Sequence, residues 1–289
     1  MALMLAPTTR AERGLVGHGV LAEIDLNIGQ WRGLLDAAEA LAADDGSAVL
    51  PRARVAVLIG DGVAAGDPGT AWVRTLVEEA ARRDGHELLW GDWTSEQAGG
   101  ATLGDVARRL SRVAEGIIAV GLPFEQLRPF SHAAHVPVWN LISDQWHPIR
   151  VLGDLVTLRA AMGAGDAPAT VVYEGPTVSP VLGSLLIASA MQGMDLRICG
   201  SEADLVDEQV LAAARGIGAF TGARLRFAGT EDVAARQARF RYGGPGGFDL
   251  VDRGGDRTPE EWRAARTDNG VAALRAVIGA TFGARPAGT

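Results

Sequence analysis

The sequence predicts an α/β protein built from two doubly wound parallel-sheet domains with a cleft between them. Short apolar runs alternate with longer amphipathic stretches along most of the chain. This alternation is interrupted once, at the turn-forming segment 163–169 (GAGDAPA), and then begins again. A length of 289 residues is enough for two domains of ordinary size. We therefore expect a first domain over 1–150, a second over 151–269, and a final helix over 270–283 that packs back on the first.

In the first half, apolar runs bounded by glycine or charged residues predict buried parallel strands. Apolar side chains at helical spacing predict the helices between them. Asn27 can cap the first helix, Thr102 and Asp105 form a capping box, and His147-Pro148 places a proline at a helix start. The expected strands are Arg54–Ile59, Glu87–Trp90, Ile117–Val120 and Val136–Trp139, and the expected helices are Leu26–Ala42, Thr70–Arg83, one from Thr102 to before Gly116, and one from Pro148 to about Met162.

The same alternation restarts in the second half and becomes less regular toward the end. Two glycine-rich stretches, Arg241–Gly247 and Asp252–Arg257, are expected to be loops on either side of the short run Phe248–Val251. Thr258-Pro259-Glu260-Glu261 has the composition of a helix start. The expected strands are Val171–Tyr173, Leu196–Cys199 and Arg224–Phe227, and the expected helices are Pro180–Gln192, about Asp204–Phe220 and about Gly270–Phe282.

Composition excludes several classes of function. A net charge of −8 argues against a general nucleic-acid surface or an anionic-membrane surface. The one cysteine, Cys199, excludes an intrachain disulfide framework and a cysteine-rich zinc site. All 27 basic residues are arginine, which excludes Schiff-base chemistry and a P-loop lysine. No signal peptide or membrane-spanning run is recognisable, so we expect a cytoplasmic protein that uses no metal and no cofactor.

Several stretches together resemble the aspartate/ornithine carbamoyltransferase family. The segment 136–158, VPVWNLISDQWHPIRVLGDLVTL, is similar to the family's V-P-V-I-N-(G/A)-x-S-D-x-x-H-P-x-Q-x-L-x-D-L-x-T. The segment 100–116 and the pieces Ser184–Leu186 and Gly193–Arg197 also match. The resemblance implies two α/β domains, a trimer with active sites between subunits, and an amino-acid acceptor that attacks carbamoyl phosphate.

The motifs that would bind the two substrates are largely missing. Carbamoyl phosphate needs arginines and helix N-terminal amides, which the family supplies through S-T-R-T. That motif falls on Gly69–Trp72 here, so that Ala71 replaces the phosphate-binding arginine, and Arg74 lies about 300° farther round the helix. Val120 and Ala101 replace further charged residues, and Arg150 replaces the glutamine of H-P-x-Q. The acceptor motifs do not appear between Phe227 and Thr258, so we expect a divergent member that binds carbamoyl phosphate poorly.

Six residues remain candidates for a site. His147 is the candidate catalytic residue, because an imidazole can polarise a carbonyl or act as a general acid. Its structural alternative is to cap its own helix beside Trp146. Arg150 can bind an anion or pair with Asp154 one turn on. The expected substrate-binding residues are Thr70, which is otherwise an ordinary helix cap, Arg150, and Asn140, Ser143 and Asp144 from the matched block.

Two functions remain open. The first is a repurposed enzyme in which His147 and Arg150 act on a different amino-acid-like or carbonyl substrate in the cleft. The second is a catalytically silent homologue that keeps the fold for assembly, as a homotrimer or as the partner of an active paralogue. If Trp72, Trp146 and Pro180 fill the cleft, the silent alternative is favoured. An open polar pocket around His147 and Arg150 would favour the enzyme.

Overall fold

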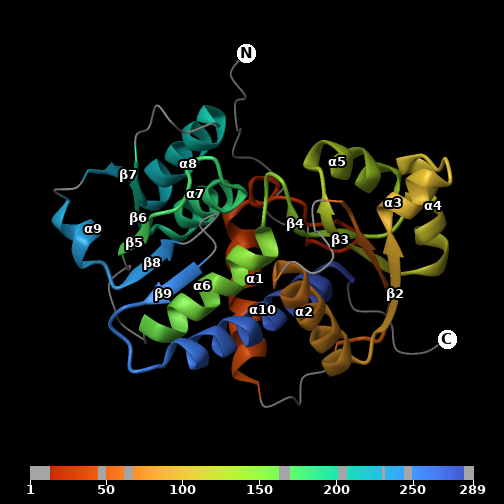
Figure 1. Ribbon diagram of the computed structural model, residues 1–289, viewed down its shortest axis with the longest axis horizontal. Helices are drawn as coiled ribbons and strands as arrows, with labels where there is room; N and C mark the ends of the chain where they lie inside the picture. Colours follow the sequence, from red (N-terminus) through yellow and green to blue (C-terminus); the bar gives the residue numbers. More distant parts are fainter. Residues whose placement is uncertain are drawn as a thin grey trace.

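Two β-sheets, each covered by helices, make up the protein (Figure 1). The computed structural model describes residues 14–44, 50–61, 68–162, 170–200, 207–229, 232–243 and 249–282. The expected hinge 163–169, the start of the chain and the glycine-rich segment 244–247 lie outside the described residues. The described part confirms the mixed α/β class with parallel sheets.

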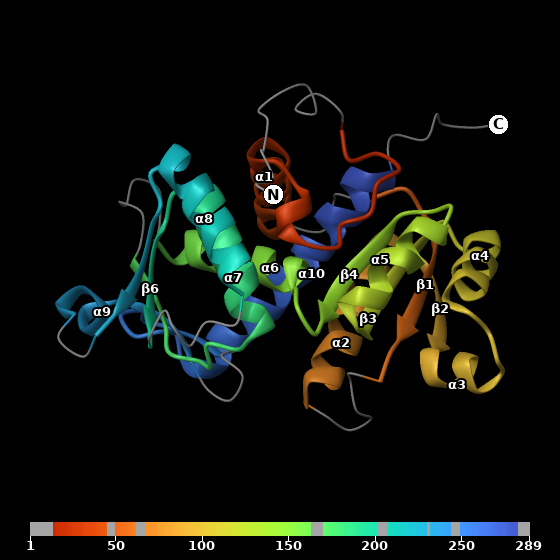
Figure 2. The same cartoon turned by 90° about the horizontal axis from the view of Figure 1, so that it is seen from above.

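The first sheet contains four parallel strands in the order β2-β1-β3-β4. Its central strand β3 is buried along its whole length, which explains why that stretch is apolar without alternation. Helices cover both faces of this sheet (Figure 2). The elements are β1 (Arg54–Ile59), α2 (Pro68–Asp84), β2 (Glu87–Asp92), α3 (Trp93–Ala98), α4 (Leu103–Val113), β3 (Gly116–Leu122), α5 (Phe124–Ala133), β4 (Val138–Ser143) and α6 (Pro148–Met162).

The helix starts that the sequence predicts are present. Before β1 the chain forms the short turn η1 (Glu23–Asp25) and then α1 (Ile28–Ala43). Asn27 and Gln30 form a capping box, in which Asn27 Oδ1 accepts from the Gln30 amide at 2.8 Å. Thr102 and Asp105 form a second one at the start of α4. These local bonds satisfy amides that the first turn of a helix leaves without partners, so local sequence is enough to fix the start of each helix.

The second sheet has the order β7-β6-β5-β8-β9, and its last strand is antiparallel to its neighbour. The expectation of a wholly parallel sheet is therefore wrong at this edge. The expectation of a loop over Arg241–Gly247 is wrong at its start, because Phe240–Gly243 forms strand β8. The elements are β5 (Thr170–Tyr173), α7 (Pro180–Gln192), β6 (Asp195–Cys199), α8 (Glu208–Thr221), β7 (Arg224–Ala228), α9 (Val233–Gln237), β8 (Phe240–Gly243) and β9 (Asp249–Asp252).

A single long helix, α10 (Pro259–Phe282), replaces the separate helix start and final helix that the sequence suggests. Gly270 reads as a break in the sequence, but the helix continues through it. A β-carbon on Gly153 of α6 would lie only 2.8 Å from the Gly270 α-carbon, so the two glycines allow the helices to cross in close contact. The predicted boundaries at 150/151 and 269/270 fall inside α6 and α10.

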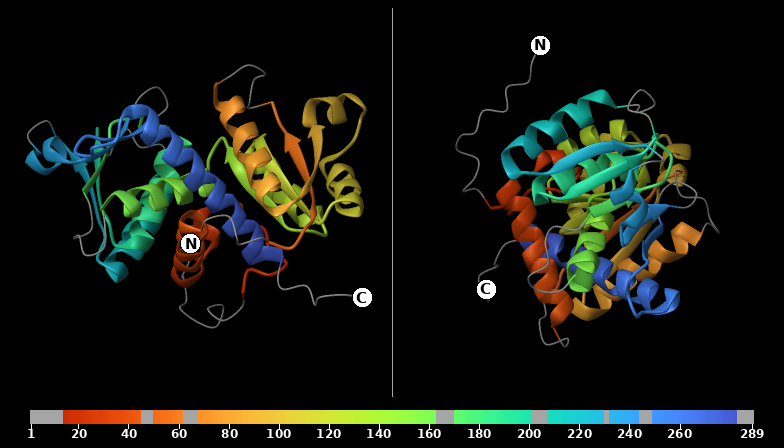
Figure 3. Two further views of the ribbon diagram at one scale, coloured as in Figure 1. Left: turned by 90° about the horizontal axis from the view of Figure 1, so that it is seen from below. Right: turned by 90° about the vertical axis from the view of Figure 1, so that its left-hand side faces the viewer.

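Helix α10 joins the two sheets. Figure 3 shows it running from the second sheet across to the first, and it packs against α1, α2 and α6. Near its end, Arg275 forms a buried two-bond ion pair with Asp84 at the end of α2, with N–O distances of 2.9 and 2.7 Å. None of the helices in the described ranges has the length and apolar character needed to cross a membrane.

Candidate functional site

The predicted site residues come together where β4 ends and α6 begins. Ser143 ends β4, and its hydroxyl accepts from the Trp146 amide at 3.1 Å while its own amide donates to the Trp146 carbonyl at 3.1 Å. These bonds close a tight turn over 143–146 and place Pro148 at the start of α6, where its missing N–H costs nothing. The turn therefore presents His147 and Arg150 at the carboxyl edge of the first sheet.

Three of the residues predicted to bind substrate form hydrogen bonds to main-chain groups of the protein itself. The buried side chain of Asn140 donates from Nδ2 to the Leu21 carbonyl at 2.8 Å and to the Trp146 carbonyl at 3.1 Å. Asp144 accepts from the Phe124 amide at 2.7 Å and so stabilises the first turn of α5. Together with Ser143 they lock the 143–146 turn against neighbouring elements. Contact of any of the three with a substrate stays a prediction.

His147 is buried and its ring is already hydrogen-bonded. The residue is 5% exposed, and the ring nitrogen Nε2 lies 2.9 Å from the Ser143 carbonyl oxygen. Because a carbonyl only accepts, Nε2 carries the proton in this bond, and a neutral ring then offers only a lone pair at Nδ1. Burial, and next the nearby Arg150 charge, lower the pKa of His147 to about 3. The ring is therefore neutral at neutral pH, with its one N–H already donated.

Arg150 follows on the first turn of α6. Its guanidinium carbon lies 4.9 Å from the centre of the Trp72 ring, which belongs to the first part of α2. Burial lowers the pKa of Arg150, and the positive charge of Arg266 lowers it further. Asp154 accepts two bonds from Arg266 of α10 at 2.7 and 2.8 Å, and its negative charge also favours the charged form of Arg150 and so acts against the fall in its pKa. Asp249 of β9 adds a second negative charge that acts on both guanidinium groups.

Arg266 is a residue of this site that the local sequence does not identify. It lies 112 residues from Asp154 in the chain, so no local spacing relates the two. Tyr242 on β8 is a second one: it is fully buried, and burial followed by the Asp154 charge raises its pKa well above the usual value. Only the tertiary crossing of α6, α10 and β8 brings these groups together.

The start of α2 carries Thr70, the remaining residue that is predicted to bind substrate. It falls in the first turn of the helix, and its side chain lies outside the described part. Arg74, one turn farther on, stacks on the Trp90 ring at 4.6 Å and pairs with Glu78 at 3.6 Å. Its guanidinium thus lies over β2. Val120 is fully buried in β3.

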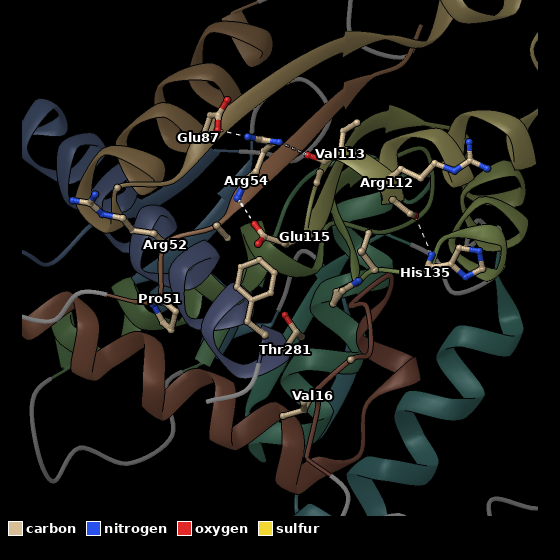
Figure 4. A pocket seen from close by; sticks show the side chains of 18 residues that line it. Val16, Pro51, Arg52, Arg54, Glu87, Arg112, Val113, Glu115, His135 and Thr281 are labelled. Atoms are coloured by element: carbon tan, nitrogen blue, oxygen red, sulfur yellow. Dashed lines mark hydrogen bonds and ion pairs between the residues drawn. The ribbon is translucent and has the colours of Figure 1, made fainter. Parts of the chain in front are cut away.

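A cavity of about 850 Å³ lies elsewhere, at the amino ends of the first sheet's strands (Figure 4). Arg54 crosses its wall, donating to Glu87 at 2.9 Å and to the Val113 carbonyl at 3.3 Å. Figure 4 shows Arg52 and Arg112 on opposite sides, both turned away from its centre. Because the strands are parallel, the cavity lies at the opposite edge of the sheet from Ser143, which ends β4. None of the six predicted site residues lines the cavity.

Comparison with known proteins bears on the first sheet most directly. Residues 73–160 match a family model described as the carbamoyl-P binding domain of aspartate/ornithine carbamoyltransferase. An ornithine carbamoyltransferase of Streptococcus suis is 31% identical over 138 residues, which cover 48% of this chain and 41% of that protein. A catabolic ornithine carbamoyltransferase of Bacillus thuringiensis is 36% identical over 111 residues, covering 38% and 33%. The chain thus spans less than half the length of these relatives, and the family match begins after Gly69–Trp72.

Solved structures extend the similarity to both sheets. The ornithine carbamoyltransferase of Gloeobacter violaceus superposes with a TM-score of 0.71 at 22% identity, covering 91% of this chain and 98% of that one. The aspartate transcarbamoylase of Trypanosoma cruzi, solved with N-(phosphonacetyl)-L-aspartic acid, gives 0.72 at 15% identity, covering 92% and 96%. At these identities the comparison shows the fold alone.

Proposed function

We propose that this chain, which belongs to the aspartate/ornithine carbamoyltransferase family, is a catalytically silent member that keeps the scaffold for assembly. The observation that carries the proposal is the protonation state of His147 together with its hydrogen bond to the Ser143 carbonyl. A neutral imidazole that already donates its N–H to Ser143 can neither protonate a leaving group nor donate to a carbonyl oxygen. The silent alternative is thus favoured over chemistry at this histidine.

The surroundings of α2 support the same proposal. Ala71 stands where the resemblance expects a phosphate-binding arginine, and Arg74 is directed onto Trp90 and Glu78. The resemblance places a second arginine at Val120. A charge-assisted hydrogen bond contributes about 1.5–3 kcal/mol, so losing both arginines removes several kcal/mol of affinity for a phosphate. Trp146 is buried and the Trp72 ring lies against the Arg150 guanidinium, which supports the silent alternative.

The purified protein is therefore expected to form no carbamoyl-ornithine or carbamoyl-aspartate from labelled carbamoyl phosphate. Isothermal titration should show no binding of carbamoyl phosphate in the micromolar range, and His147→Ala should change neither result. Native mass measurement, with the chain alone and co-expressed with an active carbamoyltransferase, should show a homotrimer or a mixed trimer. Micromolar binding, product formation that His147→Ala removes, or a strictly monomeric protein in both preparations would contradict the proposal.

A second candidate is a repurposed enzyme or binding protein for an amino-acid-like or carbonyl compound. The observation that favours it is the clustering of two guanidinium groups, Arg150 and Arg266, with the carboxylates of Asp154 and Asp249. A ligand carboxylate would bind a guanidinium group of this cluster in a partly desolvated place.

This second candidate predicts that a panel of amino acids and small carboxylates contains a compound that raises the melting temperature. Arg150→Gln, which restores the residue of the family motif, should abolish that shift because it removes the charge. Arg74→Gln is the matched control, since Arg74 lies over Trp90 and its loss should leave the shift unchanged. No shift with any compound, or an equal shift in Arg150→Gln, would remove this candidate.

A further inference from the structure

Glu23 is an acidic residue buried between elements that belong to the two sheets. It lies in η1 and no part of it is exposed. The segment just before it is tied to the first sheet, since the Val20 amide donates to the Val138 carbonyl at 3.0 Å and the Asn140 amide donates to the Val20 carbonyl at 2.9 Å. η1 itself packs against α7, which leads directly into the second sheet. The carboxyl group therefore lies in the contact between the N-terminal segment and α7.

Among the described residues, no positive charge compensates this carboxyl group. Neither of its oxygens forms an ion pair with a described side chain, and the Ser184 hydroxyl, which faces the carboxyl group, lies outside ordinary hydrogen-bond geometry. Helix α7, PVLGSLLIASAMQ, carries no titratable side chain at all. On η1 itself, Asp25 adds a negative charge, and the nearby Arg128 of α5 pairs with Asp25 at 2.9 Å. Arg32 of α1 donates to the Met191 carbonyl at the far end of α7.

Burial, the dominant influence, raises the pKa of Glu23 to about 7. The amide of Glu23 and the hydroxyl of Ser184 on α7 act in the opposite direction and favour the charged form. The Ser184 oxygen already accepts from the His147 amide at 2.8 Å, which leaves its proton free to be donated. The same serine therefore faces Glu23 on one side and the start of α6 on the other, where His147 is neutral.

We propose that Glu23 is a proton-dependent latch between the two sheets: its neutral carboxyl group packs against Ser184, and its deprotonation loosens segment 20–26 from α7. An ionised carboxylate at this place has lost its water and gains no cation from the described side chains, so the closed contact becomes less stable when the proton leaves. The latch goes beyond the proposed function and does not depend on catalysis.

The direction of the pH effect follows from the raised pKa. The closed contact holds the proton more tightly than the solvent-exposed carboxyl group does, so its stability is greatest below pH 4.5 and falls as the pH rises through about 7. For a group whose pKa is about 7 when closed and 4.5 when open, the opening equilibrium increases about tenfold between pH 6 and pH 8.

Hydrogen exchange followed by mass spectrometry on the full chain tests the latch. Backbone amides in peptides from segment 20–26 and α7 should exchange about tenfold faster at pH 8 than at pH 6, after correction for the effect of pH on intrinsic exchange. Glu23→Gln should remove this dependence, because the amide cannot ionise. Glu125→Gln, an exposed acid on α5, is the matched control and should behave as the unaltered protein does.

The proposal is overturned if these peptides show no pH dependence in the unaltered protein, or if Glu23→Gln keeps it. Should Glu23→Gln not fold, infrared spectroscopy of the unaltered protein gives an independent answer. A protonated carboxyl band should titrate with a midpoint near pH 7. Ser184→Ala should move that midpoint upward, since it removes a group that favours the charged form. Absence of a carboxyl band titrating near pH 7 would equally end the proposal.

Discussion

Replacing Arg275 by alanine is expected to lower the free energy of unfolding by about 3–5 kcal/mol, because it leaves a buried carboxylate without its cation. Arg275 and Asp84 are both essentially inaccessible and share two bonds of 2.9 and 2.7 Å. Asp84 also accepts from the Leu50 amide at 3.1 Å, so the carboxylate cannot turn away to solvent. Urea unfolding followed by circular dichroism measures the loss.

Arg82 provides the matched control for this experiment. It lies on the same helix as Asp84, and its pair with Glu79 at 2.7 Å is on the surface. Because exposed ion pairs are screened by water and salt, Arg82→Ala should leave the unfolding midpoint nearly unchanged. If Arg275→Ala were as mild as Arg82→Ala, the junction between α2 and α10 would not depend on this ion pair.

Replacing Trp139 by alanine should also cost about 3–5 kcal/mol, through the cavity that it opens in the core of the first sheet. The ring is fully buried on β4, and its Nε1 donates to the Thr281 hydroxyl at 2.9 Å. It meets the Phe282 ring edge-on, with 5.2 Å between centres. Thermal and urea unfolding should both report the loss.

Gly116 on β3 offers a reciprocal test of the same packing. A β-carbon on Gly116 would overlap the Trp139 ring, so Gly116→Ala alone should destabilise the protein by about 1–3 kcal/mol. The family resemblance places isoleucine at position 139. The double variant Gly116→Ala with Trp139→Ile should therefore be more stable than Gly116→Ala alone. Additive losses in the double variant would show that the two positions do not share one space.

Much of the fold can be predicted from local sequence. Helix α7 has the predicted bounds Pro180–Gln192, because Pro180 starts it and Gly193, with φ of 70°, ends it. Local sequence does not predict helix α5, since Pro129 lies inside it and suggests a break. It does not predict strand β8 either, because a glycine-rich sequence follows the strand directly. Its pairing with β5 and β9 is non-local, and local propensity does not report it.

The site could be predicted less well, and for a physical reason. The sequence places His147 and Arg150 at the start of α6, where the structure also has them. What each can do depends on partners that are distant in the chain: Ser184 binds the His147 amide, Trp72 covers Arg150, and Arg266 occupies Asp154. Charge state and accessibility arise from those contacts, so residue types at a given spacing do not determine them.

The path of α10 has a consequence for how the protein is made. The helix carries Arg275 to Asp84 and Thr281 to Trp139, so the interior of the first sheet is complete only when residues near the end of α10 are present. A ribosome releases the chain from its beginning, and the first sheet therefore leaves the exit tunnel long before its last partner. Until then its uncovered apolar face is exposed to chaperones and proteases.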